Sequence, residues 1–566
     1  MTQPLEPAAF VPLRSRARAA LEVARERAMV SGALPPVAPI EWPAIEIERP
    51  ANPEHGDLSS NLAMRLARPC RMAPLRIAEA LAAELTADAG RPGSIAGAVM
   101  VAPPGFLNLR VSDAALADVV SEVLAQPGAW GRVPAATPRR VNVEFVSANP
   151  TGPLHIGNAR GAFVGDLLCR VLEAAGDTVT REYYFNDFGA QVRNLGASVV
   201  AIRRGEPLPE EAYRGAYVGD LAAEIPDDVW NAAQAPDADP VAIVGHWASE
   251  RVRAGIEESL AHLGVRFDVW KSEGSLYRDG WVARAIGRLE AAGALYEDEG
   301  ALWFRSTSFG DDKDRVVRKS NGDWTYFGSD VGYVVEKFSR GFDRLVYIWG
   351  ADHHGTVARL RNAAAAMGYD RDAVQMILMA WVRFVRDGVE VSMSKRSGEF
   401  ITLDELLAEI GVDAARWFFA ARGHTSGIDF DIELAKKQSA ENPVYYVQYA
   451  HARIASILRK AAEAGMAPRV ACDAPALSAA PEAALVRIVA RFPEVVEDAA
   501  AAEETHGITA YATDLATQFH AFYRDARVVD PAEPERSAAR LTLVRATQLT
   551  LASALGLLGI SAPEAM

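Results

Sequence analysis

The segment that most constrains the fold lies at residues 140–176. A β-rich run, RVNVEFV, is followed by the turn-rich SANPTGPLHIGN and then by the apolar helical pattern ARGAFVGDLLCRVLEAAG. This strand–loop–helix order opens a doubly wound α/β domain. A second buried strand, DRLVYIWG at 343–350, ends at a glycine. We therefore predict a doubly wound domain over residues 138–410, with an insertion near 190–300.

The other parts of the chain follow different patterns. A length of 566 residues is too great for one core, so several domains are expected. Residues 1–112 predict a small α+β domain, with helices over 14–30, from near Asp57 and from near Pro74, and strands within 93–111. A linker is predicted at 113–137, and a turn-rich stretch runs over 125–140. Strands are expected to stop at about Gly411, so that 411–566 forms an all-α bundle. The acidic residues 205–245 predict a surface insertion.

Charge and cysteine spacing limit the classes of protein. The net charge is −15, which argues only weakly against a nucleic-acid partner because a local basic patch suffices. Cys70, Cys169 and Cys472 lie far apart, so neither a zinc knuckle nor a disulfide framework is expected. We find no apolar run of bilayer length and no signal-peptide pattern, so a cytoplasmic enzyme is expected.

The string His155-Ile156-Gly157-Asn158 stands between a predicted strand and a predicted helix. Free N–H groups and the helix dipole favour anions at that position, and glycine lets a nucleotide approach the backbone. Histidine can donate to a phosphate oxygen as charge develops. The alternative is an ordinary turn with a satisfied histidine.

A second polar string lies about 240 residues further on, at Ser392-Met393-Ser394-Lys395-Arg396-Ser397-Gly398. Its cations and hydroxyls beside a glycine would suit a mobile clamp on a triphosphate. Taken alone, it could equally be a solvated basic loop.

Together, the two strings resemble the HIGH and KMSKS motifs of class I aminoacyl-tRNA synthetases. Their order and separation fit, and so does the strand before the first motif. Asn158 stands where the family has its second histidine, and Ser392 stands where it has its first lysine. Asparagine still donates and accepts hydrogen bonds, and Lys395 of the second motif is present. The resemblance implies a Rossmann-type catalytic domain.

Longer strings resemble the bacterial arginyl-tRNA synthetases in particular. They cover nearly the whole chain: EFVSANPTGPLH at 144–155, YFNDFG at 184–189, YFGSD at 326–330, GADHHG at 350–355 and NPVYYVQYAHAR at 442–453. The resemblance implies an aminoacyl-tRNA ligase that activates L-arginine with ATP and transfers it to the 3′ end of tRNA(Arg). A monomer is the usual form in that family.

The implied arginine site fits the chemistry of a guanidinium, which prefers carboxylates in bidentate contact. By resemblance, Tyr326 and Asp330 hold the guanidinium, and one helical turn between them places both on one face. Glu144 and Asn149 hold the α-ammonium end and nearby groups. The remaining residues implied to contact arginine are Ser147, His155 and His353.

The implied catalytic residues are His155, Asn158 and Lys395, which act by positioning and charge stabilisation. The implied ATP site comprises Pro153, His155, Gly157, Asn158, Gly350, Asp352, His353, Met393, Ser394 and Lys395. The family often has glutamines near Asp352 and His353, so the roles of Asp352, His353 and His354 stay open. Adjacent histidines seldom chelate one ion, so no protein metal site is expected, and Mg²⁺ would arrive with ATP.

The resemblance also implies two tRNA contacts. The C-terminal bundle would bind the anticodon, where aromatic and arginine planes stack on bases. Its implied contact residues are Asn442, Tyr446, Gln448, Tyr449 and Arg453, and the alternative for each is a place in the helical core. The N-terminal domain, including Asn108, would contact the tRNA elbow. The usual terminal Pro-Glu-Arg-Met is Pro563-Glu564-Ala565-Met566 here.

Three other hypotheses for the function compete with an arginyl-tRNA synthetase. A cysteinyl or glutamyl synthetase shares the class I motifs, although a cysteinyl enzyme would need a zinc site. A small nucleotidyltransferase with an HxGH motif would not need the long helical C-terminal half. A non-catalytic tRNA-binding paralogue is kept open by Asn158, whereas Glu144, His155, Asp330 and Lys395 argue against it.

Overall fold

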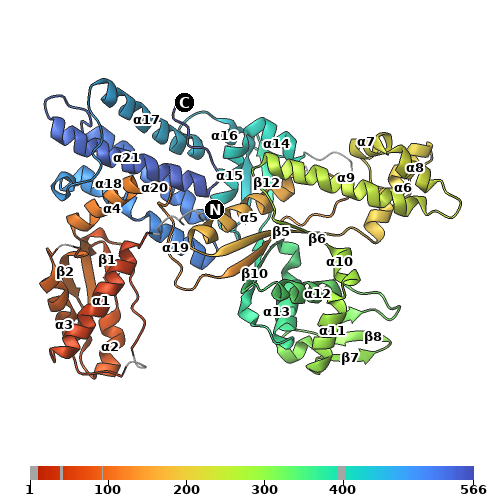
Figure 1. Cartoon of the computed structure of the whole chain (residues 1–566), viewed down its shortest axis with the longest axis horizontal. Helices are drawn as coiled ribbons and strands as arrows, with labels where there is room; N and C mark the ends of the chain where they lie inside the picture. Colours follow the sequence, from red (N-terminus) through yellow and green to blue (C-terminus); the bar gives the residue numbers. More distant parts are fainter. Residues whose placement is uncertain (1–9, 39–41, 92, 392–401) are drawn as a thin grey trace, which may run out of the picture.

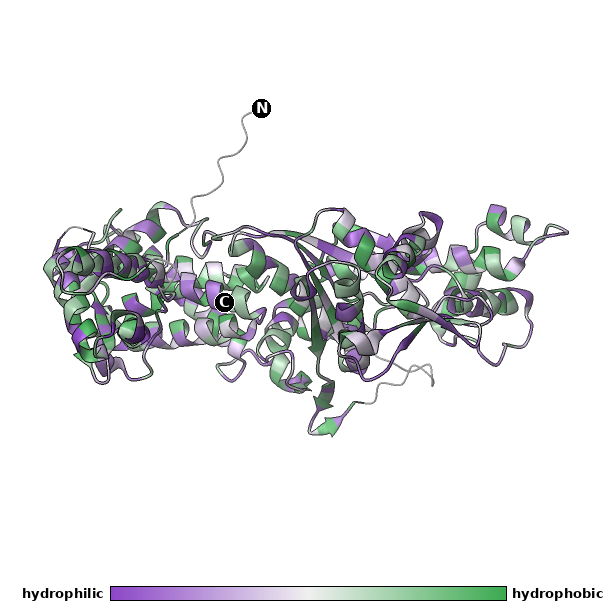
Figure 2. Ribbon diagram, turned by 90° about the horizontal axis from the view of Figure 1, so that it is seen from below, coloured by the Kyte–Doolittle hydropathy of each residue, from purple (hydrophilic) through white to green (hydrophobic). Residues whose placement is uncertain are grey.

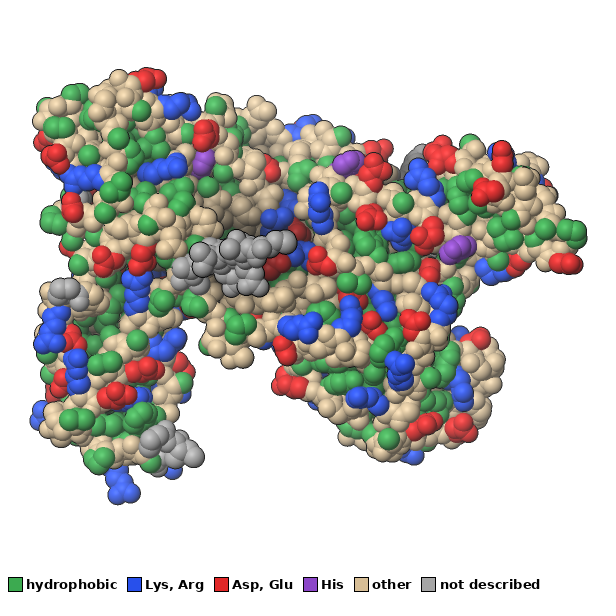
Figure 3. All heavy atoms as spheres, viewed as in Figure 1, with side chains coloured by type: hydrophobic (Ala, Val, Ile, Leu, Met, Phe, Trp, Pro, Cys, Tyr) green, Lys and Arg blue, Asp and Glu red, His purple; other side chains and the backbone are tan. Residues whose placement is uncertain are grey.

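The computed structural model describes residues 10–38, 42–91, 93–391 and 402–566. An N-terminal part, a central sheet with its covering helices, and a C-terminal group of helices follow one another along the chain (Figure 1). The N-terminal part and the region of α10 to α13 project from the same side of the molecule, with open space between them (Figures 1 and 3).

The N-terminal part is an antiparallel sheet of order β1-β3-β2 covered by helices. Its elements are α1 (Leu13–Val30), β1 (Leu58–Ser60), α2 (Leu62–Cys70), α3 (Pro74–Asp88), β2 (Ala96–Ala102) and β3 (Phe106–Val111). The predicted helices at 14–30 and from Pro74 are confirmed. The helix expected from near Asp57 begins later, because Leu58–Ser60 pairs with β3 as a strand first.

The central sheet confirms the predicted doubly wound α/β fold. Among the described residues it has five parallel strands in the order β11-β10-β4-β5-β6. These strands are β4 (Arg140–Glu144), β5 (Thr178–Phe185), β6 (Val269–Ser272), β10 (Arg344–Gly350) and β11 (Val374–Met379). Figure 2 shows hydrophobic residues concentrated in the strands at the middle of the molecule. The strand order reverses between β4 and β10, and a crevice forms at the carboxyl ends of strands at such a point.

Long inserted segments separate the strands of the central sheet along the chain. Between β5 and β6 lie α6 (Ala190–Arg204), α7 (Ala216–Glu224), α8 (Asp227–Ala233) and α9 (Pro240–His262). The segment expected as a surface insertion, 205–245, holds α7, α8 and the start of α9. Between β6 and β10 lie α10 (Glu273–Arg278), α11 (Trp281–Ala291), β7 (Leu295–Asp298), β8 (Ala301–Phe304), β9 (Arg315–Arg318) and α12 (Tyr326–Ser339). The range 190–300 therefore includes β6, a strand of the central sheet itself.

The expectation that strands stop at Gly411 is wrong. β14 (Ile428–Asp431) pairs in parallel with β12 (Val382–Arg386), which also pairs with β13 (Val389–Glu390). Four residues are too short for their alternation to stand out from the surrounding helical pattern, and pairing with a distant strand makes them extended. The neighbouring helices are α13 (His354–Ala366), α14 (Leu403–Ile410), α15 (Val412–Ala420) and α16 (Ile432–Lys436).

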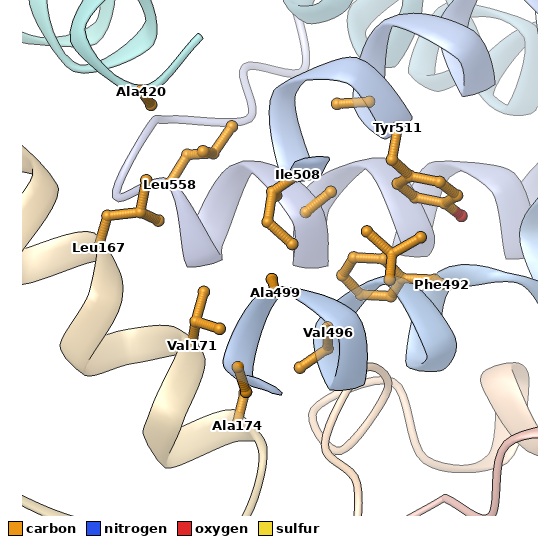
Figure 4. Packing of buried hydrophobic residues seen from close by; sticks show 14 of the residues in the cluster. Leu167, Val171, Ala174, Ala420, Phe492, Val496, Ala499, Ile508, Tyr511 and Leu558 are labelled. Carbon is orange, nitrogen blue, oxygen red and sulfur yellow. The ribbon is translucent and has the colours of Figure 1, made fainter. Parts of the chain in front are cut away.

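The C-terminal helices pack on the central part and on the predicted linker. They are α17 (Pro443–Glu463), α18 (Ala480–Ala490), α19 (Phe492–Ala502), α20 (His506–Asp525) and α21 (Pro534–Leu557). The segment expected as a linker begins with a helix, α4 (Asp113–Ala125), which contacts α18 and α21. Val171 and Ala174 of α5 (Ile156–Ala174) face Ala499 and Val496 of α19, and Leu167 of the same helix points toward Leu558 (Figure 4). No helix in the described ranges is both long and apolar enough to cross a membrane.

Candidate active site

A cleft of about 810 Å³ opens at the carboxyl ends of the central strands, on both sides of the point where their order reverses. Residues from β4, β5, β10, α5, α10, α12 and α13 meet there, although they are far apart in the sequence. The sequence-predicted residues that line it are Glu144, Ser147, Asn149, Gly157, Asn158, Tyr326, Asp330, Gly350, Asp352 and His353.

The first motif forms the N-terminal cap of α5. The Nδ1 atom of His155 accepts a hydrogen bond from the Gly157 N–H at 3.0 Å, and Asn158 Oδ1 accepts from the His155 N–H at 3.2 Å. A Cβ atom on Gly157 would lie 2.7 Å from the His155 ring, so the cap requires glycine there. The other N–H groups of this first helical turn and the helix dipole favour an anion at the cleft.

The loop between β4 and this cap has an unusual backbone. Val146 and Ser147 have φ angles of 66° and 44°, in the left-handed region that a β-branched residue rarely adopts. The Tyr183 hydroxyl holds the turn, since it donates to Ala148 O at 2.8 Å and accepts from the Ala148 N–H at 3.0 Å. Strain of this kind persists where the surrounding structure enforces it, commonly at functional sites. Beyond the turn, Asn149 donates to Gln191 Oε1 at 2.7 Å.

Glu144 ends β4 and is buried beside a buried cation. Lys337 Nζ lies 2.6 Å from Glu144 Oε2, and the Lys337 side chain is fully buried. The ammonium also lies 4.2 Å and 4.0 Å from the ring centroids of Tyr333 and Tyr347. Burial raises the pKa of Glu144 above its usual range, while Lys337 opposes this shift. The pair thus brings an ion-paired carboxylate to the cleft.

Tyr326 and Asp330 lie on one face of α12 and both line the cleft, as their spacing predicted. Thr325 caps this helix with its side chain, which starts α12 at Tyr326. Burial raises the pKa of Asp330 to about 7, opposed by the positive charge of Arg359 and reinforced by the negative charge of Glu144. At neutral pH, Asp330 is therefore poised to ionise when a cation binds beside it.

Sequence reasoning missed several residues of this cleft. Glu273, the first residue of α10, is buried and lines the cleft, and its Oε1 accepts from Ser329 Oγ at 2.9 Å. Burial raises the pKa of Glu273. Arg359 and Lys337 are the cations beside these carboxylates. No local pattern marks these residues, because each belongs to a different helix and only the packing of α10, α12 and α13 brings them together.

Some sequence-predicted residues lie elsewhere. Pro153 lines a separate pocket formed with α7, α9 and α14 instead of the cleft. Met393, Ser394 and Lys395 lie outside the described residues. Among the described residues, we find no group of three or more His, Cys, Asp or Glu side chains placed to hold a metal ion.

Three of the residues predicted to contact tRNA are buried and have internal partners. Asn108 accepts from Ser59 Oγ at 2.8 Å. Asn442 caps α17 and donates to Ala435 O and Lys437 O, each at 3.0 Å. Gln448 donates to Asp413 Oδ2 at 2.8 Å and to Ser561. Their side chains therefore organise the protein itself.

The other three residues predicted to contact tRNA lie on an aromatic surface of α17 and α20; they are Tyr446, Tyr449 and Arg453. Tyr449 is 41% exposed, and Tyr446 and Arg453 are half-buried. The Arg453 guanidinium lies 4.7 Å from the Tyr523 ring centroid, and His520 lies 5.2 Å from the Tyr446 ring. Acidic and basic side chains are interspersed over the face seen in Figure 3. Aromatic and guanidinium planes of this kind can stack on unpaired bases.

The parallel sheet, the capped helix at its switch point and the helical C-terminal part fit a class I aminoacyl-tRNA synthetase, and the match to the class I catalytic-domain model shows that class. Three family models match consecutive parts of the chain: the arginyl tRNA synthetase N terminal domain at 22–111, the class I (R) tRNA synthetase catalytic domain at 119–216 and 246–425, and the DALR anticodon binding domain at 447–566. The chain is 46% identical to the arginine–tRNA ligase of Citrifermentans bemidjiense, over 93% of this chain and 96% of that protein. It is 42% identical to the arginine–tRNA ligase of Bacillus subtilis, over 93% of this chain and 95% of that protein.

Solved structures agree in fold. Arginyl-tRNA synthetase from Thermus thermophilus has a TM-score of 0.75 at 24% identity and covers 97% of this chain and 100% of its own. The Plasmodium falciparum enzyme has a TM-score of 0.73 at 16% identity, and the match covers 99% of this chain and 100% of that one. The chain belongs to the arginyl-tRNA synthetase family. It is an aminoacyl-tRNA ligase that activates L-arginine with ATP and charges tRNA with it.

Proposed function

We propose that the cleft holds arginine between the α12 face and the end of β4. Tyr326 and Asp330 would bind the guanidinium, with the Glu273 carboxyl beside them. Glu144, Asn149 and the Ser147 loop would bind the α-ammonium end. A flat cation with five donors suits several carboxylates placed around it. The observation that carries this proposal is that Asp330, Glu273 and Glu144 line one cleft beside the N-terminus of α5.

We infer that ATP lies at the N-terminus of α5 and along the end of β10. Gly157 and Asn158 would offer the helix terminus to the phosphates, and His155 would stabilise developing charge. Gly350, Asp352 and His353 would border the nucleotide, together with Met393, Ser394 and Lys395 of the second motif. Pro153 lines the separate pocket and would not contact the nucleotide. Mg²⁺ would be bound through the ATP phosphates.

The proposed reaction has two steps. The arginine carboxylate attacks the α-phosphate of ATP, and pyrophosphate leaves as arginyl-adenylate forms. A hydroxyl of the terminal tRNA ribose then attacks the acyl carbonyl, and AMP leaves. Neither step needs a protein nucleophile, so the residues act through positioning and electrostatic stabilisation.

We propose that the other parts of the chain bind tRNA. Residues 1–112 would contact the elbow, and residues 411–566 would present the anticodon surface, although β14 pairs with the catalytic part. Tyr446, Tyr449 and Arg453 are the candidate contacts, whereas Asn108, Asn442 and Gln448 would support the fold. We infer a cytoplasmic monomer, by the family's usual form, and the three cysteines are free thiols, which suits a reducing compartment.

Amino-acid-dependent exchange of pyrophosphate into ATP tests this proposal. All twenty amino acids are screened with and without total tRNA, and exchange is expected with arginine only. Asp330→Asn should raise the arginine KM by about 10-fold or more, because a charge-assisted hydrogen bond is lost, and should leave the ATP KM unchanged. Asp372→Asn, an exposed aspartate paired with Arg361, is the matched control. An unchanged arginine KM in Asp330→Asn would refute the pocket assignment.

A further inference from the structure

Tyr347 is a residue of the cleft to which neither motif assigns a role. It lies in β10, is 2% exposed and lines the cleft. Its register partner in the parallel pair is Glu144 of β4, so the two residues lie side by side near the carboxyl ends of their strands. Within the described part of the chain, its hydroxyl has no hydrogen-bond partner.

The ring of Tyr347 is held in place by a buried cation. Lys337 Nζ lies 4.0 Å from the ring centroid and is itself tied to Glu144 Oε2 at 2.6 Å. The Trp349 ring centroid lies 5.3 Å from that of Tyr347. The side chain is therefore packed against both of these groups and is buried.

The hydroxyl lies in the field of three carboxylates, those of Glu144, Asp330 and Glu182. Burial raises the pKa of Tyr347 well above its usual value, and the charges of Glu144 and Asp330 are the next largest causes. The group is thus a neutral phenol at physiological pH. Tyr347 is the register partner of Glu144, the carboxylate assigned above to the α-ammonium end of arginine, and it lines the same cleft as Asp330.

A buried hydroxyl without a partner destabilises the folded state, because it has lost water and gained nothing in return. Native proteins pair nearly all such groups, and an exception in a binding cleft points to a partner that arrives with the ligand. Cationic ligands drawn to Glu144 and Asp330 bring N–H donors, which a phenol oxygen accepts.

We propose that the Tyr347 hydroxyl hydrogen-bonds the bound arginine between Glu144 and Asp330, as a further specificity-determining contact of the known reaction. This inference rests on the proposed arginine site. An amino acid without an N–H at that point would leave the hydroxyl unsatisfied and would be rejected more strongly.

Tyr347→Phe removes only the oxygen atom, and the full-length chain is used. The dissociation constant for L-arginine, measured by isothermal titration calorimetry, should rise about 3- to 10-fold, while that for ATP stays unchanged. The melting temperature of the ligand-free protein should stay the same or rise, since no protein hydrogen bond is lost. A residue with a purely structural hydroxyl would behave in the opposite way.

Tyr511→Phe supplies the matched control. Tyr511 is equally buried, but its hydroxyl donates to Ile488 O at 3.0 Å in the helical bundle. This variant should lose thermal stability and keep its arginine affinity.

Asp330→Asn in the same series distinguishes loss of the Tyr347 contact from loss of the whole arginine site. Weakened arginine binding in Asp330→Asn with unchanged binding in Tyr347→Phe would overturn the Tyr347 contact alone. Unchanged binding in Asp330→Asn would overturn the arginine site on which the contact rests. Weakened binding in both variants, with full stability of ligand-free Tyr347→Phe, supports the proposal.

Discussion

Lys337 Nζ lies 2.6 Å from Glu144 Oε2, both side chains are buried, and Glu144 lines the cleft. Lys337 comes from α12, the same helix that presents Tyr326 and Asp330. One helix therefore carries two groups proposed to bind the guanidinium and also the cation that pairs with the carboxylate at the end of β4. The ion pair fixes the position of that helix against the central sheet.

Lys337→Met should destabilise the protein by about 3–5 kcal/mol, because it leaves the Glu144 carboxylate buried without its cation. Chemical denaturation measures the free energy of unfolding. Lys271→Met is the control, since its partner Glu336 keeps Arg340 at 3.0 Å. Equal losses of stability in the two variants would contradict this account. The residual folded Lys337→Met protein should also bind arginine more weakly, because Glu144 becomes easier to protonate.

Arginine affinity should depend on pH through Asp330, because burial raises the pKa of this carboxyl to about 7. Below that pH the carboxyl must lose its proton before it can pair with a guanidinium. Affinity should therefore rise about 10-fold per pH unit from pH 5 to near 7 and then level off. Calorimetry in buffers of different ionisation enthalpy should detect one proton released per arginine at low pH.

The same pKa shift sets the sign of a stability effect. Because the folded pKa lies above the unfolded one, the contribution of Asp330 to stability is fully present below the unfolded pKa and is lost as pH rises through about 7. Asp330→Asn should remove the pH dependence of arginine affinity and also the pH dependence of stability that this carboxyl contributes. A flat arginine affinity in the unmodified protein across this range would refute the assignment.

Tyr449 and Gln448 are neighbours on α17, but substitution of the first should affect tRNA binding and substitution of the second should affect stability. Tyr449→Ala should weaken tRNA binding by about 1–3 kcal/mol, the usual effect of one base–aromatic stack, with little change in melting temperature. Gln448→Ala should instead lower stability by about 1–3 kcal/mol, because Asp413 and Ser561 lose its amide donor. Filter binding and thermal unfolding, run on both variants, check the contrast. Equal losses of tRNA affinity would place both side chains at the interface.

Lys395→Ala should slow arginine-dependent pyrophosphate exchange by about 100- to 1,000-fold, the usual effect of removing one group that stabilises transition-state charge. The affinity for tRNA should not change. Lys437→Ala, an exposed lysine paired with Glu441, is the control and should leave the exchange rate unaltered. A normal rate in Lys395→Ala would show that the second motif does not act on the triphosphate.

The hydrophobic pattern and residue spacing within short segments were enough to predict the main elements of the fold and part of the site. The strand, loop and helix at 140–176 and the strand at 343–350 were predicted because each has its own hydrophobic pattern. The spacing of Tyr326 and Asp330 placed both on one helical face, which the cleft confirms. Such signals lie within a few turns or one strand of the chain, so the sequence contains them in full.

Contacts between distant segments were decided only by the tertiary structure. Lys337 and Glu144 are 193 residues apart, and β14 is a strand only because β12 lies beside it. Asn442 and Gln448 carry the same polar groups as a tRNA contact would, yet packing turns them inward to cap and brace the C-terminal helices. Side-chain type and spacing specify what a residue can bind, whereas the packing of remote helices and strands determines which partner it meets.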